Sequence, residues 1–215
     1  MPDPVPADGC DRLIYLHGFR SSPRSIKAQM FARRMAQAGR ATDFVCPALP
    51  DSPAAAIAMI LDSIRPTPRD VVVGSSLGGF YARYVAEQCD PRTVLLNPSV
   101  RPAESLARHL GRGTRFHSDE PFEFVAEHLN ELRAFEVPRV SRPERCLLIA
   151  ATGDELLDWR DMVAAWEGAR TLVIEGSDHA LSDFDLHIDH VLAFAGIGPA
   201  GSAQVAQPLT GEPLT

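Results

Sequence analysis

Lysine is almost absent from this chain of 215 residues: Lys27 is the only one, and arginine supplies the other basic side chains. The Gly-Lys-Ser/Thr ending of a phosphate-binding P-loop therefore occurs nowhere in the sequence. The formal net charge of −7 argues against a nucleic-acid partner, which usually needs a strongly basic face. Solubility is a sufficient explanation of the negative charge.

Paired cysteines of the kind that bind zinc or exchange disulfides are also missing. The four cysteines form no C-x-x-C pair, and the sequence predicts neither a metal site nor a cofactor. No apolar run reaches the roughly 18 residues of a membrane span. The first residues, Met1-Pro2-Asp3-Pro4, lack the apolar core of a signal peptide, and we expect a cytoplasmic location.

The most informative stretch is Gly74-Ser75-Ser76-Leu77-Gly78, which fits the pattern G-x-S-x-G. The valines at 71–73 predict a strand buried on both faces, and the spacing of apolar residues over 80–88 predicts a helix. A serine between a strand and a helix is typical of a nucleophile elbow. Only Ser76 is in frame, because Ser75 lacks flanking glycines. Gly74 and Gly78 leave room for so tight a turn.

Strands and helices alternate along most of the chain. Strands are predicted at 12–17, 41–46, 71–73, 92–97, 145–151 and 170–174, and helices at 25–38, 53–64, 80–88, 158–166 and 183–195. This order predicts an α/β fold whose six-stranded sheet is mostly parallel, with helices on both faces. Ligands bind beyond the carboxyl ends of such strands, where His17-Gly18, Ser76, Asp154 and His179 all stand.

The length predicts a single domain, which we expect over residues 12–196. We expect a flexible N-terminal arm at 1–11 and a disordered C-terminal tail at 197–215. Residues 101–143 interrupt the alternation with two helical patterns, at 102–110 and 120–135, and no obvious strand. This helical insertion is either a lid that moves over the pocket or a fixed cover, and the sequence favours neither.

A nucleophilic serine needs a general base and a carboxylate that orients the base. Of the seven histidines, His179 is the best candidate for the base, because it follows the last strand. Asp154 follows the strand before it and is the best candidate for the carboxylate. Glu155, Asp158 and Asp178 remain alternatives to Asp154.

Two backbone N–H groups are candidates for an oxyanion hole, the site that stabilises negative charge on the reacting oxygen. One belongs to Leu77, directly after the serine at the start of a helix. The other belongs to Phe19, in the loop after the first strand, where Gly18 lets the backbone approach a substrate. We expect the neighbouring His17 to make a structural hydrogen bond.

Two further patterns receive a simpler interpretation. His187 and His190 are three residues apart on a helix, and without a third ligand they are typical of a solvated helix face. Residues 196–201 match G-x-G-x-x-G, but they follow a helix instead of a strand, so we interpret the match as chance.

In combination, these motifs resemble the YqiA-like esterases, small bacterial members of the α/β-hydrolase superfamily. The matching stretches are 15–19 with 21–23, 73–80, 96–98 with 100–102, 152–155, and 175–180. The resemblance implies an α/β-hydrolase fold and hydrolysis of carboxylic esters or thioesters of acyl groups. It also implies that Ser76, Asp154 and His179 form a catalytic triad.

We therefore expect a serine hydrolase that acts on a small-molecule ester or thioester through an acyl-enzyme. The alternative is a non-catalytic binding protein with a hydrolase fold, which would bind a ligand without turnover. The acyl length, the leaving group and the oligomeric state do not follow from the sequence.

Overall fold

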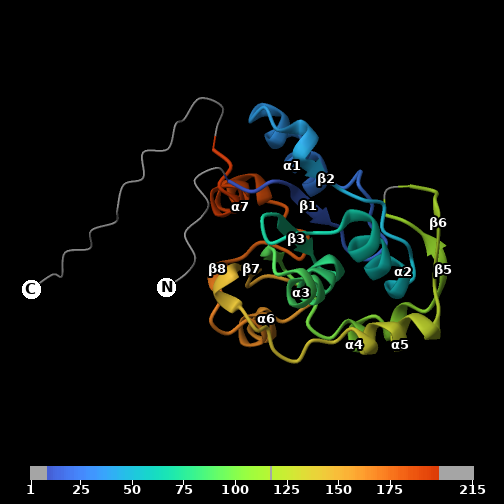
Figure 1. Ribbon diagram of the computed structural model, residues 1–215. Helices are drawn as coiled ribbons and strands as arrows, with labels where there is room; N and C mark the ends of the chain where they lie inside the picture. The colour runs from blue at the N-terminus through green and yellow to red at the C-terminus, as the bar shows by residue number, and fades with distance from the viewer. Residues whose placement is uncertain (1–8, 117, 199–215) are drawn as a thin grey trace, which may run out of the picture.

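The computed structural model describes residues 9–116 and 118–198 and has a six-stranded sheet at its centre (Figure 1). The strands are β1 (Leu13–Leu16), β2 (Phe44–Val45), β3 (Val71–Ser75), β4 (Arg92–Leu96), β7 (Cys146–Ala151) and β8 (Arg170–Ile174). They lie in the order β2-β1-β3-β4-β7-β8, and every neighbouring pair is parallel. The predicted α/β fold is confirmed.

Helices cover both faces of the sheet. They are α1 (Ile26–Gln37), α2 (Pro53–Ala58), α3 (Leu77–Cys89), α6 (Trp159–Ala165) and α7 (Ile188–Ala195). Figure 1 shows α1 and α7 on one face and α2, α3 and α6 on the other. Side chains of β1 alternate between the two cores: Leu13 and Tyr15 join α1 and α7, whereas Ile14 and Leu16 join α2 and α3. Burial on both faces explains why the inner strands β1, β3 and β7 are almost continuously apolar.

Side-chain caps set the first residues of three helices. Ser25 accepts a hydrogen bond from an N–H in the first turn of α1, and Ser52 does the same at α2. Asp158 caps α6 in this way. The predicted helix at 53–64 divides into α2 and a π-helical stretch, Met59–Ile64, which ends at Arg65 with a φ of 52°.

One predicted strand and one predicted helix each begin with a 3-10 turn in the structure, so both elements are shorter than expected. The strand predicted at 41–46 is a 3-10 turn, Ala41–Asp43, followed by the two residues of β2. Residues 41–43 form the 3-10 turn instead of joining the sheet, so only Phe44 and Val45 pair with β1. The helix predicted at 183–195 begins as a 3-10 turn, Phe184–Leu186, before α7.

The all-helical expectation for residues 101–143 is wrong. An antiparallel hairpin of β5 (Gly111–Thr114) and β6 (Pro121–Phe124) lies between α4 (Pro102–Ser105) and α5 (Ala126–Ala134). A 3-10 turn, Ala107–His109, precedes the hairpin. Phe122 and Phe124 are buried while Glu123 between them is exposed. This alternation with a period of two indicates a strand, and it was visible in the sequence.

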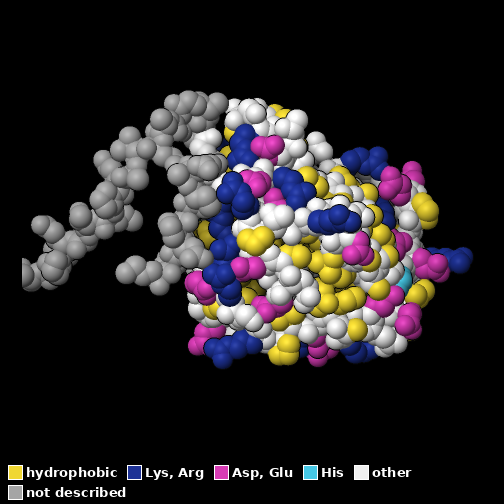
Figure 2. Space-filling view, in the orientation of Figure 1, with side chains coloured by type: hydrophobic (Ala, Val, Ile, Leu, Met, Phe, Trp, Pro, Cys, Tyr) yellow, Lys and Arg dark blue, Asp and Glu magenta, His cyan; other side chains and the backbone are white. Residues whose placement is uncertain are grey.

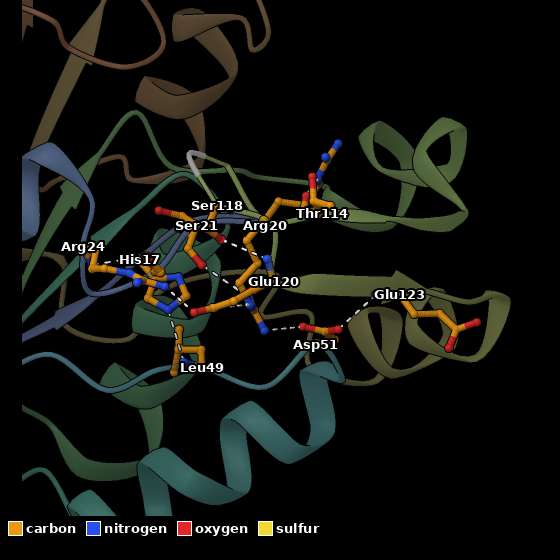
Figure 3. Close-up of polar contacts among 12 residues, drawn as sticks. His17, Arg20, Ser21, Arg24, Leu49, Asp51, Thr114, Ser118, Glu120 and Glu123 are labelled. Carbon is orange, nitrogen blue, oxygen red and sulfur yellow. Dashed lines mark hydrogen bonds and ion pairs between the residues drawn. The ribbon is translucent and has the colours of Figure 1, made fainter.

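The hairpin packs against the loop after β1 and the segment before α2. The ring of Phe19, in the loop after β1, meets Phe122 and Phe124 edge to face, with centroids 4.9 and 5.1 Å apart. Asp51, before α2, accepts hydrogen bonds from the Arg115 guanidinium (2.5 Å) and the Glu123 N–H (3.0 Å), and Figure 3 shows Asp51 next to Glu123. Through these contacts the hairpin of β5 and β6 packs against the rest of the domain.

The packed body is slightly longer at both ends than the predicted 12–196. Cys10 is buried, and its N–H donates to the Ala195 carbonyl at 3.0 Å. Ile197 is also buried against the core that contains α7. The rest of the predicted arm and tail, residues 1–8 and 199–215, lies outside the described residues.

We predict that Phe124→Ala lowers the free energy of unfolding by about 3 kcal/mol, because a buried aromatic ring leaves a cavity. Urea denaturation measures this change. Val125→Ala is the matched control, because Val125 is exposed and its truncation should cost under about 0.5 kcal/mol. A loss below about 1 kcal/mol for Phe124→Ala would show that the hairpin does not belong to the cooperative fold.

Candidate active site

Ser76 occupies a sharp turn between β3 and α3. Its backbone has a φ of 54° and a ψ of −118°, a conformation that few non-glycine residues adopt. The turn is possible because glycines stand on both sides of it. A Cβ on Gly74 would lie 2.2 Å from the Gly78 carbonyl oxygen, and one on Gly78 would lie 2.0 Å from the Leu16 carbonyl oxygen. The structure thus holds the serine hydroxyl at the carboxyl edge of the sheet.

Two hydrogen bonds connect Ser76 with the predicted base and carboxylate. Ser76 Oγ lies 3.0 Å from Nε2 of His179, and Nδ1 of His179 lies 2.8 Å from Oδ2 of Asp154. A carboxylate can only accept, so the proton of a neutral imidazole belongs on Nδ1. Nε2 then faces the serine hydroxyl with its lone pair, which is the arrangement that a general base needs.

Asp154 is fixed in place by the turn that follows β7. Its side chain is fully buried. Its second carboxylate oxygen, Oδ1, accepts from the N–H groups of Leu156 and Leu157, each at 2.9 Å. Both oxygens therefore have donors, and the carboxylate cannot rotate away from the imidazole without losing them.

The acidic residues that the sequence left as alternatives make other contacts. Glu155 accepts the backbone N–H of His179 at 2.9 Å, so it holds the histidine loop instead of the ring. Asp158 caps α6. Asp178 accepts from the N–H and the hydroxyl of Ser182, which holds the pKa of its carboxyl below the usual range.

The two predicted oxyanion-hole residues lie next to the serine. Leu77 is the first residue of α3, where an N–H has no acceptor within the helix. The loop that carries Phe19 is close enough that a Cβ on Gly18 would lie 3.2 Å from the Ser76 Cβ. Phe19, Leu77 and Ser76 line the same pocket. Their role as an oxyanion hole remains a prediction.

His17 holds the loop after β1 in place. Its buried ring accepts the Leu49 N–H at Nε2 (3.1 Å), and therefore carries its proton on Nδ1, 3.1 Å from the Gly18 carbonyl oxygen. Burial lowers the pKa of His17 to about 4, so the ring is neutral at pH 7. The structural hydrogen bond expected of His17 is present, and Figure 3 shows the contact with Leu49.

Asn97 is a positioning residue to which the sequence analysis gave no role. It follows β4, is buried, and has a φ of 40°. Its Nδ2 donates to the carbonyls of Asp178 and His179 at 3.0 and 3.2 Å, and its Oδ1 accepts the Ala151 N–H at 2.8 Å. One side chain thus joins the ends of β4 and β7 to the histidine loop. Its position directly after a strand was the only indication in the sequence.

Two pockets meet at Ser76 and His179. One encloses about 240 Å³, and its apolar lining consists of Phe19, Leu77, Leu106, Phe116, Leu156 and Leu157. The other encloses about 320 Å³, and its apolar lining includes Tyr15, Ile26, Met30, Phe116 and Leu181. Phe19 and Phe116 border both. Ser76 therefore borders two largely apolar spaces.

The other sequence patterns form no comparable site. His187 contacts Asp183 at 3.3 Å, His190 is exposed, and residues 9–116 and 118–198 contain no group of three or more potential metal ligands. Gly196 ends α7 with a φ of 70°, and residues 199–201 of the predicted chance match lie outside the described residues. In that same part of the chain, no helix is both long and apolar enough to cross a bilayer.

Comparison with known proteins gives a family and a fold. The model of a family described as "Uncharacterised protein family (UPF0227)" matches residues 12–196. A UPF0227 protein of Pectobacterium carotovorum is 27% identical over 138 residues, which are 60% of this chain and 67% of that protein.

Solved structures of hydrolases share the fold at low sequence identity. Alpha/beta hydrolase domain-containing protein 10 from mouse is 17% identical with a TM-score of 0.63, over 84% of this chain and 89% of that one. A structure from the metagenome-derived lipolytic enzymes LipS and LipT is 19% identical with a TM-score of 0.65, over 87% and 94% of the two chains. These likenesses confirm the α/β-hydrolase fold.

We predict that acid destabilises the protein through His17. Between pH 6.5 and 4, His17 becomes protonated in the unfolded chain but stays neutral in the folded chain, where its pKa is about 4. Protonation therefore stabilises the unfolded state in this pH range. The free energy of unfolding should therefore fall by about 2–3 kcal/mol more for wild type than for His17→Gln between pH 7 and 4.5. Urea denaturation at both pH values measures the difference.

His190→Gln is the control, because it removes an exposed histidine. If wild type and His17→Gln lose the same free energy of unfolding between pH 7 and 4.5, the prediction is contradicted.

We predict that Asn97→Ala lowers the free energy of unfolding by about 3 kcal/mol or more. The change removes the acceptor of the buried Ala151 N–H, the Asn97 donor to the His179 carbonyl and one of two donors to the Asp178 carbonyl. It also puts alanine at a positive φ. Chemical denaturation measures the loss, and exposed Asn130→Ala is the control. A loss under about 1 kcal/mol would mean that these hydrogen bonds do not hold the strand ends together.

Proposed function

Because this chain belongs to the uncharacterised protein family UPF0227, the YqiA family that its motifs resemble, and because it has an α/β-hydrolase fold, we propose that it is a serine hydrolase. Its proposed substrates are carboxylic esters or thioesters. The observation that carries the proposal is the line of two hydrogen bonds from Ser76 through His179 to buried Asp154. The two apolar pockets beside the hydroxyl, and the lipolytic activity named for one structural neighbour, also support it.

In the first proposed step, the Ser76 oxygen attacks the acyl carbonyl carbon while Nε2 of His179 takes the hydroxyl proton. The imidazole becomes a cation at that moment. Asp154 stabilises it through the hydrogen bond to Nδ1, which also keeps the ring in the reactive tautomer. Because Asp154 already accepts from two backbone N–H groups, it is oriented before the reaction begins.

The carbonyl oxygen becomes negative in this step, and the N–H groups of Phe19 and Leu77 are proposed to hold it. The N-terminus of α3 adds its partial positive charge at the same point. Removing one such donor typically slows the reaction about 10²- to 10³-fold. Both donors are backbone groups, so side-chain substitution cannot delete them.

The second half of the reaction regenerates the serine. His179 gives its proton to the leaving alcohol or thiol, and the carbon–oxygen or carbon–sulfur bond breaks to leave an acyl-enzyme on Ser76. A water molecule then attacks the acyl carbon as His179 takes its proton. That proton returns to the serine oxygen when the acid departs. Water is the only co-substrate that this balance requires.

We predict that a fluorophosphonate probe adds once to the wild-type protein and not at all to Ser76→Ala, because only an activated hydroxyl displaces the fluoride. Intact-mass analysis measures the adduct. Ser75→Ala is the matched control, since it removes the neighbouring hydroxyl and leaves the elbow serine. Hydrolysis of p-nitrophenyl butyrate should fall by about 10⁴-fold or more in Ser76→Ala.

The absence of an adduct on folded wild-type protein would contradict the proposed function. Ligand binding without turnover would then favour the alternative, a non-catalytic protein with a hydrolase fold. An adduct that persists in Ser76→Ala and disappears in Ser75→Ala would instead move the nucleophile to the other serine.

A further inference from the structure

The charge inside the two pockets differs from that of the whole chain. The net charge is −7, yet no residue that lines either pocket is Asp or Glu. Their charged side chains are Arg20 and Arg108 in the smaller pocket and Lys27 in the larger one. On the face shown in Figure 2, by contrast, basic and acidic side chains are interspersed. An anion bound in either pocket would therefore contact basic side chains, and no lining carboxylate would compete with the anion for them.

Arg20 is held in a defined orientation at the mouth of the smaller pocket. Its Nε donates to the Thr114 carbonyl at 2.7 Å (Figure 3). Its guanidinium lies 4.9 Å from the centre of the Phe116 ring. No described carboxylate lies within 4.0 Å of it, and no described group accepts from its two terminal nitrogens. A guanidinium fixed in this way loses little side-chain freedom when it binds a ligand.

Arg108 provides a second cation at the same pocket. Its Nε donates to Nε2 of His109 at 3.2 Å, and it too forms no ion pair with a described carboxylate. The ring of His109 packs 5.7 Å from that of Phe19, next to the serine. Partial burial, and then the charges of Arg108 and Arg20, lower the pKa of His109, which indicates that both guanidinium groups act on this imidazole.

Lys27, in the larger pocket, already has partners. Its ammonium donates to the Ala180 carbonyl and is attracted by the charge of Asp178. Burial lowers its pKa to about 8, so it loses its charge just above neutral pH, where an arginine stays charged. The two arginines are therefore the better-prepared anion site.

We propose that Arg20 and Arg108 form a carboxylate-binding subsite, and that the substrate is an ester or thioester one arm of which ends in a carboxylate. This inference rests on the proposed hydrolase function. Arginine matches a carboxylate with two parallel N–H···O bonds, and the apolar lining between the arginines and Ser76 suits the hydrocarbon chain that joins the two ends of such a molecule. The hydrolysis itself proceeds as described above.

The test compares two matched pairs of esters. p-Nitrophenyl hexanoate and p-nitrophenyl monoadipate differ by a carboxylate on the acyl arm, whereas phenyl acetate and 4-acetoxybenzoate differ by one on the alcohol arm. We expect kcat/KM to favour the anionic member of one pair by about tenfold after correction for the uncatalysed rate. The pair that shows the preference identifies the arm. The preference should weaken as the salt concentration rises, because the pocket mouth is exposed.

Matched variants assign the preference to residues. Arg20→Gln and Arg108→Gln should each reduce the anionic-to-neutral ratio of kcat/KM by about three- to tenfold. Arg33→Gln, an exposed arginine on α1 that lines neither pocket, changes the net charge equally and should leave the ratio as in wild type. Loss of the preference in Lys27→Met, with both arginine variants unaffected, would overturn the assignment, as would equal kcat/KM values within both pairs.

A binding measurement separates this inference from the proposed function. In the Ser76→Ala background, calorimetry compares monomethyl adipate with methyl hexanoate and 4-acetoxybenzoate with phenyl acetate, and the same titrations are repeated with Arg108→Gln added. Tighter binding of the anionic ester of one pair, weakened about three- to tenfold by Arg108→Gln, supports the subsite even if the wild-type protein fails to hydrolyse any ester. Equal affinity within both pairs, together with normal fluorophosphonate labelling, overturns the subsite and leaves the hydrolase function standing.

Discussion

The close approach of three backbone segments at Ser76 is the constraint on which the site depends. A Cβ added to Gly74 would lie 2.2 Å from the carbonyl oxygen of Gly78 in the elbow. A Cβ added to Gly78 would lie 2.0 Å from the carbonyl oxygen of Leu16 in β1. This contact sets α3 directly against the sheet and keeps Ser76 at a positive φ. It also places the loop after β1 beside the serine. The strain at one residue is therefore supported by the packing of β1, β3 and α3, as is typical of functional sites.

The same edge of the sheet also fixes the candidate base, His179, and the candidate carboxylate, Asp154. Asn97 joins the end of β4 to the end of β7 and to the histidine loop, and Glu155 holds the backbone of His179 from the other side. His179 itself lies on a loop, where a side chain is normally less well positioned than on a strand. Hydrogen bonds to its backbone from Asn97 and Glu155 compensate for this and support the ring in its place between Ser76 and Asp154.

Local patterns predicted the central features of the fold, and contacts between distant segments decided the rest. The valines before Ser76 and the glycines around it specify a strand and a turn through their own backbone preferences, so the sequence alone was sufficient there. The hairpin of β5 and β6 is different, because Phe19 and Asp51, which are far away in sequence, stabilise it. The three hydrogen bonds of Asn97 likewise depend on strand order, which no local pattern contains.

The proposed reacting groups and part of the pocket lining lie on different parts of this molecule. The groups that would react lie at the ends of strands in the central sheet, whereas Leu106, Arg108 and Phe116, which shape one pocket, belong to the insertion at 101–143. Arg20 connects the two parts, since its own backbone carbonyl accepts the Phe116 N–H and its side chain donates to Thr114. A change in the insertion can therefore alter the lining of the pocket while the backbone contacts that hold the elbow stay the same, because none of those contacts comes from the insertion.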